Sequence, residues 1–388
     1  MDVYQARLVA EFPLAQAGIA GYFELLQLMP DELRRARGLS GPIGALKMPF
    51  AAPNLARWHK RSALELVDHF VSDPYLKAVL LAQAGDYATP PSQASAIMHT
   101  MLINHYLNGG YYPVGGGGAI PKAFVRALKR AGGELRLSTP VARILVEDNR
   151  AIGVVLEDGE EIRAQTVISN ADPHVTFDRL IGREHLSSKL KTRLDDLRWS
   201  TSSLSLYAAV DMDLRAAGFD SGNYWYYQTP DVDGLYRYSQ TSALASDLEP
   251  QLLFLTVTTL KDPTKMHSGH HTIELFTFIG YDAFATWADQ PTGARDADYL
   301  ALKEELTEAM LDAAESIIPG FRQHVVFREL GTPLTNAHYV NGYRGNIYGI
   351  DKTVAQTGQG SFAAETEIDG LYLCGASTLS HGAVSYTH

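Results

Sequence analysis

The sequence predicts a chain of the α/β class with α+β mixed regions. Three observations carry this prediction: residues 1–110 show helical spacing of apolar side chains, residues 134–170 alternate short β-branched segments with turns, and residues 176–330 mix both patterns. The 388 residues, 46% of them hydrophobic and 20% charged, are enough for two or three folding units with a large core. This composition excludes a disordered, collagenous or disulfide-stapled chain.

The first region carries start signals for helices. Ser62-Ala-Leu-Glu65 forms a capping box, in which the hydroxyl and the carboxylate satisfy exposed backbone amides at a helix start. Ser72-Asp73-Pro74 predicts another start, because proline lacks the N–H that would be unpaired there. The apolar run Ala94–Leu107 is shorter than the roughly 20 residues of a membrane-spanning helix, so we expect a buried helix. Binding to the surface of a membrane stays open.

The character of the chain changes at Tyr111. A glycine loop leads into a helix expected to start near Pro121 and to end at Gly132-Gly133. A β-meander is then predicted, with a hairpin at Asp158-Gly159, from the segments ELRLSTPV, ARILVED, AIGVVLE, EEIRA and TVISN. It ends at Asn170-Ala-Asp172-Pro173.

Residues 176–330 combine strand and helix patterns and predict a mixed sheet. The expected strands lie at 202–210, 223–228, 251–259 and 271–279, and a helix is expected over Asp298–Ile318. The aromatic run 224–227 favours packing within a sheet, with the wall of an apolar pocket as the alternative. After a loop-rich stretch, a last strand is expected at 370–374.

The charge balance and the cysteine content narrow the class of protein. With 33 basic and 44 acidic residues the net charge is −11, and no basic patch opposes it, so we expect no nucleic-acid partner. The single Cys374 excludes an intrachain disulfide and is expected as a buried structural thiol. Without a signal-peptide pattern at the start, a cytoplasmic location is expected, or a mitochondrial one in a eukaryote.

Two motifs carry little chemistry. Gly358-Gln-Gly360-Ser-Phe-Ala363 satisfies the spacing G-x-G-x-x-A, but neither a strand before it nor a helix after it is predicted. His267-Ser-Gly-His270-His271 lacks a placed carboxylate or thiolate and favours a solvated turn. A metal hydrolase built on these histidines is the least favoured function, and we assign no metal.

A late strand that enters a turn of small residues is more informative. In Gly370–Thr378 the strand ends in Gly375-Ala-Ser, where backbone amides can approach a bulky anionic cofactor because no side chain obstructs them. Together with the meander and its loops, this turn favours nucleotide binding.

Residues 111–173 and 368–378 resemble the phytoene desaturase and carotenoid isomerase-like flavoproteins. The resemblance extends to the phytoene dehydrogenase-related oxidoreductases, which include the pyridine nucleotide-disulfide oxidoreductase domain proteins. It implies an FAD/NAD(P)-binding flavoprotein fold like that of the amine oxidases, with FAD as cofactor. The substrate domain would comprise the helices of 1–110 and the sheet of 176–330, and the FAD domain the helix and meander of 111–175 and the return at 331–388.

The resemblance also implies cofactor-binding residues. Val141 would face the adenine end, Gly375, Ala376 and Ser377 the pyrophosphate and ribityl chain, and Gly382, Ala383 and Val384 the flavin ring. Two features of the family are missing: the N-terminal βαβ unit with its glycine turn and the closing C-terminal helix. By analogy, roughly a hundred or more residues that include this unit are expected ahead of Met1. The fold is therefore expected to be incomplete.

The function implied is an FAD-dependent oxidoreductase or isomerase that acts on an apolar, isoprenoid-type small molecule by hydride transfer to flavin. The activity of this chain alone and its oligomeric state stay open, and no catalytic residue is assigned. His338, Tyr339 and Arg344 are expected on a packed helix with an exposed arginine, with a position facing the flavin as the alternative. The alternative function is a lipid- and protein-binding member of the same fold without enzymatic activity, similar to Rab GDP-dissociation inhibitors.

Overall fold

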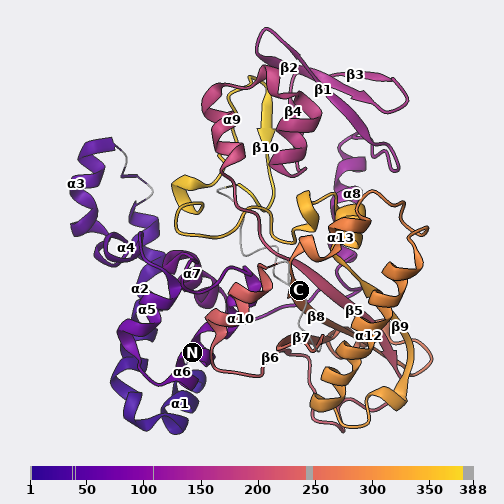
Figure 1. The fold of residues 1–388 in the computed structure, drawn as a ribbon. Coiled ribbons are helices and arrows are strands. Elements are labelled where there is room, and N and C mark those ends of the chain that lie inside the picture. Colours follow the sequence, from indigo (N-terminus) through magenta and orange to yellow (C-terminus); the bar gives the residue numbers. More distant parts are fainter. Residues whose placement is uncertain (1, 37, 40, 108, 242–247, 379–388) are drawn as a thin grey trace.

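The computed structural model describes residues 2–36, 38–39, 41–107, 109–241 and 248–378, and Figure 1 shows their arrangement. Its first part is helical, as the apolar spacing predicts. The capping box at Ser62 is confirmed: Glu65 N–H donates to the Ser62 hydroxyl at 3.1 Å, and Ser62 N–H donates to the Glu65 carboxylate at 2.8 Å. The helices are α1 (Asp2–Glu11), α2 (Gln16–Ala36), α3 (Gly41–Ala51), α4 (Pro53–Trp58), α5 (Ala63–Phe70), α6 (Pro74–Leu81) and α7 (Ala96–Leu107).

A five-stranded sheet forms the second part. Its strands are β5 (Ser202–Val210), β6 (Asn223–Tyr227), β7 (Leu252–Val257), β8 (His271–Ile279) and β9 (Val325–Gly331), in the order β6-β7-β8-β5-β9. The four strands expected from the sequence are confirmed to within two residues. The sequence did not indicate β9, because this edge strand is largely exposed and lacks apolar alternation. Every strand pair is antiparallel, whereas the sequence predicts a mixed sheet.

Both faces of this sheet are covered. One face, with Trp225, Tyr227 and Phe278, joins the core of the N-terminal helices and of α10 (Val232–Ser239). The other face packs against α12 (Ala297–Ile317), next to the short α11 (Thr258–Lys261) and α13 (Pro333–Val340). The Trp225 ring lies edge-on to Phe254 at 4.8 Å between centroids, so packing within the sheet is confirmed for the aromatic run.

A smaller region occupies the top of Figure 1. An antiparallel meander of β1 (Val141–Glu147), β2 (Arg150–Leu156) and β3 (Glu161–Arg163) stands beside a parallel pair, β4 (Val167–Ser169) with β10 (Leu371–Leu373). The helix α9 (Ser188–Asp195) packs against the parallel pair, whereas α8 (Ala119–Arg130) lies below the meander in Figure 1 and has no buried residue.

Two predictions for the meander are wrong. Residues 134–140 form no strand, because the bond from Glu157 N–H to Pro140 at 3.1 Å is not continued into a ladder of hydrogen bonds along them within the described residues. The segment TVISN belongs to β4, which leaves the meander and pairs in parallel with β10.

The parallel pair buries one face and exposes the other. Leu371 and Leu373 lie in a core with Phe177 and Leu190 of α9, while Ile168 and Tyr372 on the opposite face are 66% and 38% exposed. Parallel sheets are usually covered on both faces. Among the described residues, therefore, only one face of this two-stranded sheet is covered by other side chains. No helix in the described part of the chain has the length and the apolar character that a bilayer crossing requires.

Candidate cofactor site

Three segments meet at the carboxyl end of the parallel pair. Asn170–Pro173 follow β4, Cys374–Thr378 follow β10, and Val340–Gly349 cross beside them; together they line a cavity of about 220 Å³. Because β4 and β10 run in the same direction with Ser169 opposite Leu373, the residues after both strands emerge at one edge. Ligands of open α/β sheets bind at this edge.

Glycine allows these segments to approach one another. Gly375 has φ of +99°, and a Cβ there would lie 2.3 Å from the Asn170 Oδ1 atom. Gly349, with φ of +70°, would place a Cβ 2.4 Å from the Ser377 Oγ atom. Only glycine combines such angles with such contacts at little cost. The two glycines therefore keep backbone atoms accessible beside the cavity.

Three consecutive backbone donors lie in this turn. Cys374 N–H donates to Ser169 at 2.9 Å and Thr378 N–H to Gly375 at 3.1 Å, but the amides of residues 375–377 have no hydrogen-bond partner among the described residues. Successive free N–H groups without obstructing side chains form an anion-binding concavity. The residues present thus fit the phosphate or ribityl part of a dinucleotide cofactor.

Asp172 organises the loop opposite the turn. Its carboxylate accepts hydrogen bonds from Asn346 Nδ2 at 2.7 Å, from Tyr343 N–H at 3.2 Å and from His174 N–H at 3.1 Å. Burial raises the pKa of Asp172, and these hydrogen bonds oppose the rise. The sequence pointed to the loop but not to this role, since the partners lie about 170 residues away in the chain.

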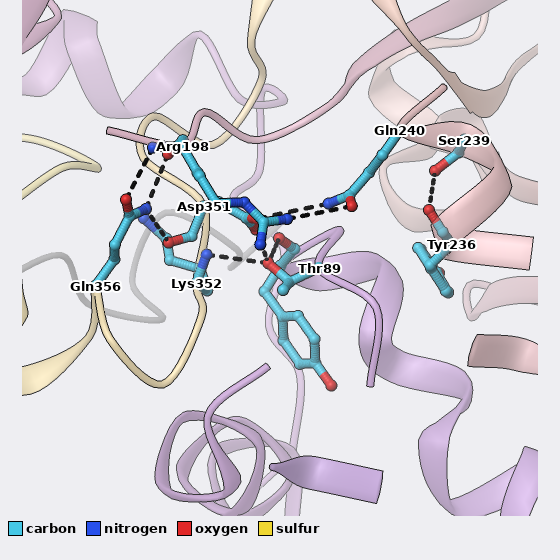
Figure 2. Close-up of polar contacts among 9 residues, drawn as sticks. Thr89, Arg198, Tyr236, Ser239, Gln240, Asp351, Lys352 and Gln356 are labelled. Carbon is cyan, nitrogen blue, oxygen red and sulfur yellow. Dashed lines mark hydrogen bonds and ion pairs between the residues drawn. The ribbon is translucent and has the colours of Figure 1, made fainter. Parts of the chain in front are cut away.

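A buried pair of charged residues lies behind the turn, and Figure 2 shows its surroundings. Lys352 is 1% exposed, and its Nζ donates to the Ala376 carbonyl at 2.7 Å. Asp351 is fully buried; it forms an ion pair with Arg198 at 3.3 Å and accepts hydrogen bonds from Thr89 and Gln240. Sequence reasoning missed both residues. The available signal was two adjacent opposite charges next to an apolar segment.

The sequence-predicted cofactor residues fall into three groups. Gly375, Ala376 and Ser377 form the turn just described, and Ala376 and Ser377 line the cavity. Val141 begins β1, opposite Leu156, and is 36% exposed. It lines none of the cavities described here, so its contact with a cofactor stays a prediction. Gly382, Ala383 and Val384 lie outside the described residues.

The meander and the turn are nevertheless connected. The β1–β2 hairpin bonds to the start of β10, with Ala151 N–H donating to Asp369 at 2.8 Å and Asp369 N–H to Asn149 at 3.0 Å. β1 runs toward this junction and β10 runs away from it. Val141 and Gly375 therefore lie at the ends of their strands that are remote from it.

Two further site expectations can be compared with the structure. The prediction that Cys374 is buried is wrong: the thiol is exposed and borders the cavity, because residue 374 follows the last paired residue of β10 and turns away from the core. Arg344 is exposed as expected and forms an ion pair with Asp282. The expected packed helix is wrong for these residues: α13 ends at Val340, so Arg344 lies in a turn beyond it, and His338 and Tyr339 at the end of α13 are exposed.

A second cavity lies next to this site and differs from the apolar compartment that the resemblance implies. It measures about 550 Å³, and charged residues such as Arg183, Arg198 and Arg344 line it together with aromatic rings. Each of these arginines is paired with a carboxylate. His267 and His270 form a turn before β8, as expected, whereas His271 is the buried first residue of β8. The described residues contain no group of three or more potential ligands placed to hold a metal.

A glycine turn at the carboxyl end of parallel strands, next to a meander and a separate region of sheet and helices, defines a dinucleotide-binding protein of the flavoprotein type. Residues 10–385 match the family described as flavin containing amine oxidoreductase. The chain belongs to this family, which implies FAD as the cofactor.

Solved structures support the fold. The chain is similar to an oxidoreductase from Methanosarcina mazei, with a TM-score of 0.55 and 17% identity over 89% of this chain and 70% of the other. It is also similar to a triple mutant of putrescine oxidase, with a TM-score of 0.59 and 14% identity over 96% of this chain and 74% of the other. The amine oxidase-like fold class is thereby confirmed.

Curated relatives share more of the sequence. All-trans-retinol 13,14-reductase of Danio rerio is 31% identical over 85% of this chain and 56% of its own length. Prolycopene isomerase of Arabidopsis thaliana is 25% identical over 97% of this chain and 61% of its own length. The chain thus spans only about three fifths of the length of these relatives.

Proposed function

We propose that this chain is part of an FAD-dependent oxidoreductase or isomerase that acts on carbon–carbon double bonds of an apolar polyene. The names of the relatives, a retinol reductase and a prolycopene isomerase, support this substrate class. The single observation that carries the proposal is the turn Gly375–Ser377, whose three amides have no partner within the described residues and lie beside a cavity at a strand edge.

The chain's own residues would hold and orient the cofactor. The amides of residues 375–377 would bind its anionic part, and the absence of a Cβ at Gly375 allows close approach. Asp172 would keep the opposite loop in place through its bonds to Tyr343 and Asn346. FAD, when bound, supplies the capacity to accept or donate a hydride.

We assign the apolar substrate compartment to the junction between the N-terminal helices and the five-stranded sheet. This junction contains the aromatic side chains Trp225, Tyr227 and Phe276, which suit a polyene better than the charged cavity of about 550 Å³ does. The aromatic rings contact residues of the helices, so entry of a long substrate requires the helices to separate from the sheet.

The test begins with the visible spectrum of the purified chain after incubation with FAD and desalting. We expect retained yellow absorbance that heat releases. The second step adds dithionite and all-trans-retinol or prolycopene under anaerobic conditions, with product analysis by chromatography. Conversion supports the proposed substrate class, while bound FAD without conversion of either polyene contradicts it.

A colourless protein that folds and binds hydrophobic probes would overturn the proposal. It would favour the lipid-binding alternative that the sequence left open. Gly375→Ala serves as the matched variant, because it should lose FAD while its fold persists.

A further inference from the structure

We infer that Lys352 is a positioning residue of the cofactor turn: its buried side chain fixes the Ala376 carbonyl and thereby aims the following amide at the bound anion. The inference rests on the proposed function, because it concerns the same turn. Lys352 lines neither the cavity of about 220 Å³ nor that of about 550 Å³ and would act through the backbone of residues 375–377.

The geometry of the peptide group transmits this effect. Lys352 Nζ donates to the Ala376 carbonyl oxygen at 2.7 Å from the buried side of the turn. A trans peptide is planar, so its C=O and its N–H point in opposite directions. Fixing the Ala376 oxygen toward the interior therefore directs the Ser377 N–H away from Lys352. A cation on the oxygen also polarises the amide, which strengthens its N–H as a donor to an anion.

The backbone of Lys352 is itself held in place. Its N–H donates to the Thr89 hydroxyl at 3.0 Å, and its carbonyl accepts from Ser95 N–H at 3.1 Å. Both partners lie in the segment between α6 and α7. The helical part of the chain therefore fixes the position of the Lys352 backbone, from which the side chain extends. Lys352 therefore connects the turn with the helical part of the chain.

The charge of Lys352 is not neutralised by a direct ion pair. Among the described residues, no carboxylate oxygen comes within 4.0 Å of its Nζ, and the adjacent Asp351 directs its carboxylate to Arg198, Thr89 and Gln240. Asp351 and Arg198 balance each other, so these three residues carry one net positive charge when Lys352 is protonated. Figure 2 shows Asp351 enclosed by these partners.

Burial lowers the pKa of Lys352 to about 7, and the charge of Asp351 opposes this shift. The side chain can therefore lose its proton near neutral pH in the cofactor-free protein. An anion bound at the turn favours the ammonium form and raises the pKa. Binding of FAD above neutral pH should then take up a proton, and affinity should fall as the pH rises.

A stability role alone explains the lysine poorly. Replacing buried charges by apolar groups of similar size is often neutral or stabilising, so a buried lysine without a carboxylate partner is a net cost to the fold. A role at the turn accounts for a lysine at this buried position. A role in stability and a role in positioning can be distinguished by measurement. Only in the second does a change of Lys352 alter the orientation of the amides of residues 375–377.

The first experiment uses the chain without FAD. Hydrogen–deuterium exchange of the peptide covering 371–378 is compared among the wild type, Lys352→Met, Lys352→Gln and the control Lys129→Met, which changes an exposed lysine on α8. The free amides of residues 375–377 should exchange fast in every variant. The hydrogen-bonded amides of this peptide, such as those of Cys374 and Thr378, should exchange about tenfold faster in Lys352→Met, because a hydrogen bond from a charged group that orders the turn is lost. The acceleration should be smaller in Lys352→Gln, which keeps a donor. The control should match the wild type.

The second experiment measures FAD affinity by quenching of flavin fluorescence between pH 6 and 9.5. Wild-type affinity should fall about tenfold or more across this range, while Lys352→Gln should bind weakly with little pH dependence. Calorimetry of FAD binding at pH 8, in buffers of different ionisation enthalpy, should show proton uptake by the wild type only.

The outcomes separate the inference from the proposed function. If the wild type binds no FAD at any pH, the proposed function fails, and the exchange experiment still decides whether Lys352 orders the turn. If FAD binds but the variants equal the wild type in exchange, affinity and proton uptake, the inference is overturned. If Lys352→Met does not fold, Lys352→Gln carries the comparison.

Discussion

The substitution Gly375→Ala tests the cradle most directly. It adds one methyl group at a residue whose φ is +99°, where that methyl would lie 2.3 Å from the Asn170 Oδ1 atom. Two costs follow. The backbone angle is unfavourable for alanine by about 1 to 2 kcal/mol, and the contact forces the exposed Asn170 side chain to rotate.

A matched control separates these costs from cofactor binding. Gly159, in the β2–β3 hairpin, has φ of +90°, and nothing lies within 4 Å of an added Cβ. Gly159→Ala should therefore lose the same free energy of unfolding, about 1 to 2 kcal/mol, without affecting the cavity. The free energy of unfolding of Gly375→Ala should fall by a similar amount, since rotation of the Asn170 side-chain amide relieves the contact.

The two variants should differ in FAD affinity. The methyl at Gly375 occupies the space through which the cofactor approaches the free amides, so we expect affinity to fall about tenfold or more, equal to at least about 1.4 kcal/mol. Adding Asn170→Ala to Gly375→Ala should not restore binding, because the methyl remains. Urea denaturation and flavin fluorescence titration measure both quantities. Equal FAD affinities of Gly375→Ala and Gly159→Ala, within twofold, would refute the reasoning.

Three further predictions follow from particular residues. The exposed Cys374 thiol borders the cavity, so a thiol reagent should modify it readily in the free protein and at least about tenfold more slowly with FAD bound; equal rates would place the cofactor elsewhere. Ser62→Ala removes the hydroxyl that caps α5 and should lower the free energy of unfolding by about 1 kcal/mol, seen as an earlier denaturation midpoint; an unchanged midpoint contradicts it. Burial raises the pKa of Asp86 from 3.8 to about 7. The folded state therefore binds this proton more tightly, and stability falls as pH rises through that interval. Asp86→Asn should be more stable than the wild type by up to about 4 kcal/mol at pH 8 and nearly equal at pH 4; a gain that does not change with pH would argue against the raised pKa.

Local signals carried most of the secondary structure. The capping box at Ser62 and the alternation over 202–210 and 271–279 involve neighbours in the chain, so the sequence by itself placed these elements. The strand 371–373 and its glycine turn are local in the same sense. The resemblance of 111–173 and 368–378 to flavoproteins then indicated the family and FAD, which the match over residues 10–385 confirmed.

The site depends on contacts that no local pattern contains. β4 pairs with β10 rather than with the meander, residues 134–140 stay outside any strand, and Cys374 faces the cavity instead of the core. Each of these outcomes depends on which segment, often a hundred or more residues away, lies alongside. Lys352 is the clearest case, because its partner Thr89 lies 263 residues away in the chain. The sequence by itself determined which elements form and which family they belong to. Only the tertiary structure decided which backbone amides stay free and which charges are buried, because pairing and burial are properties of segments brought together by folding.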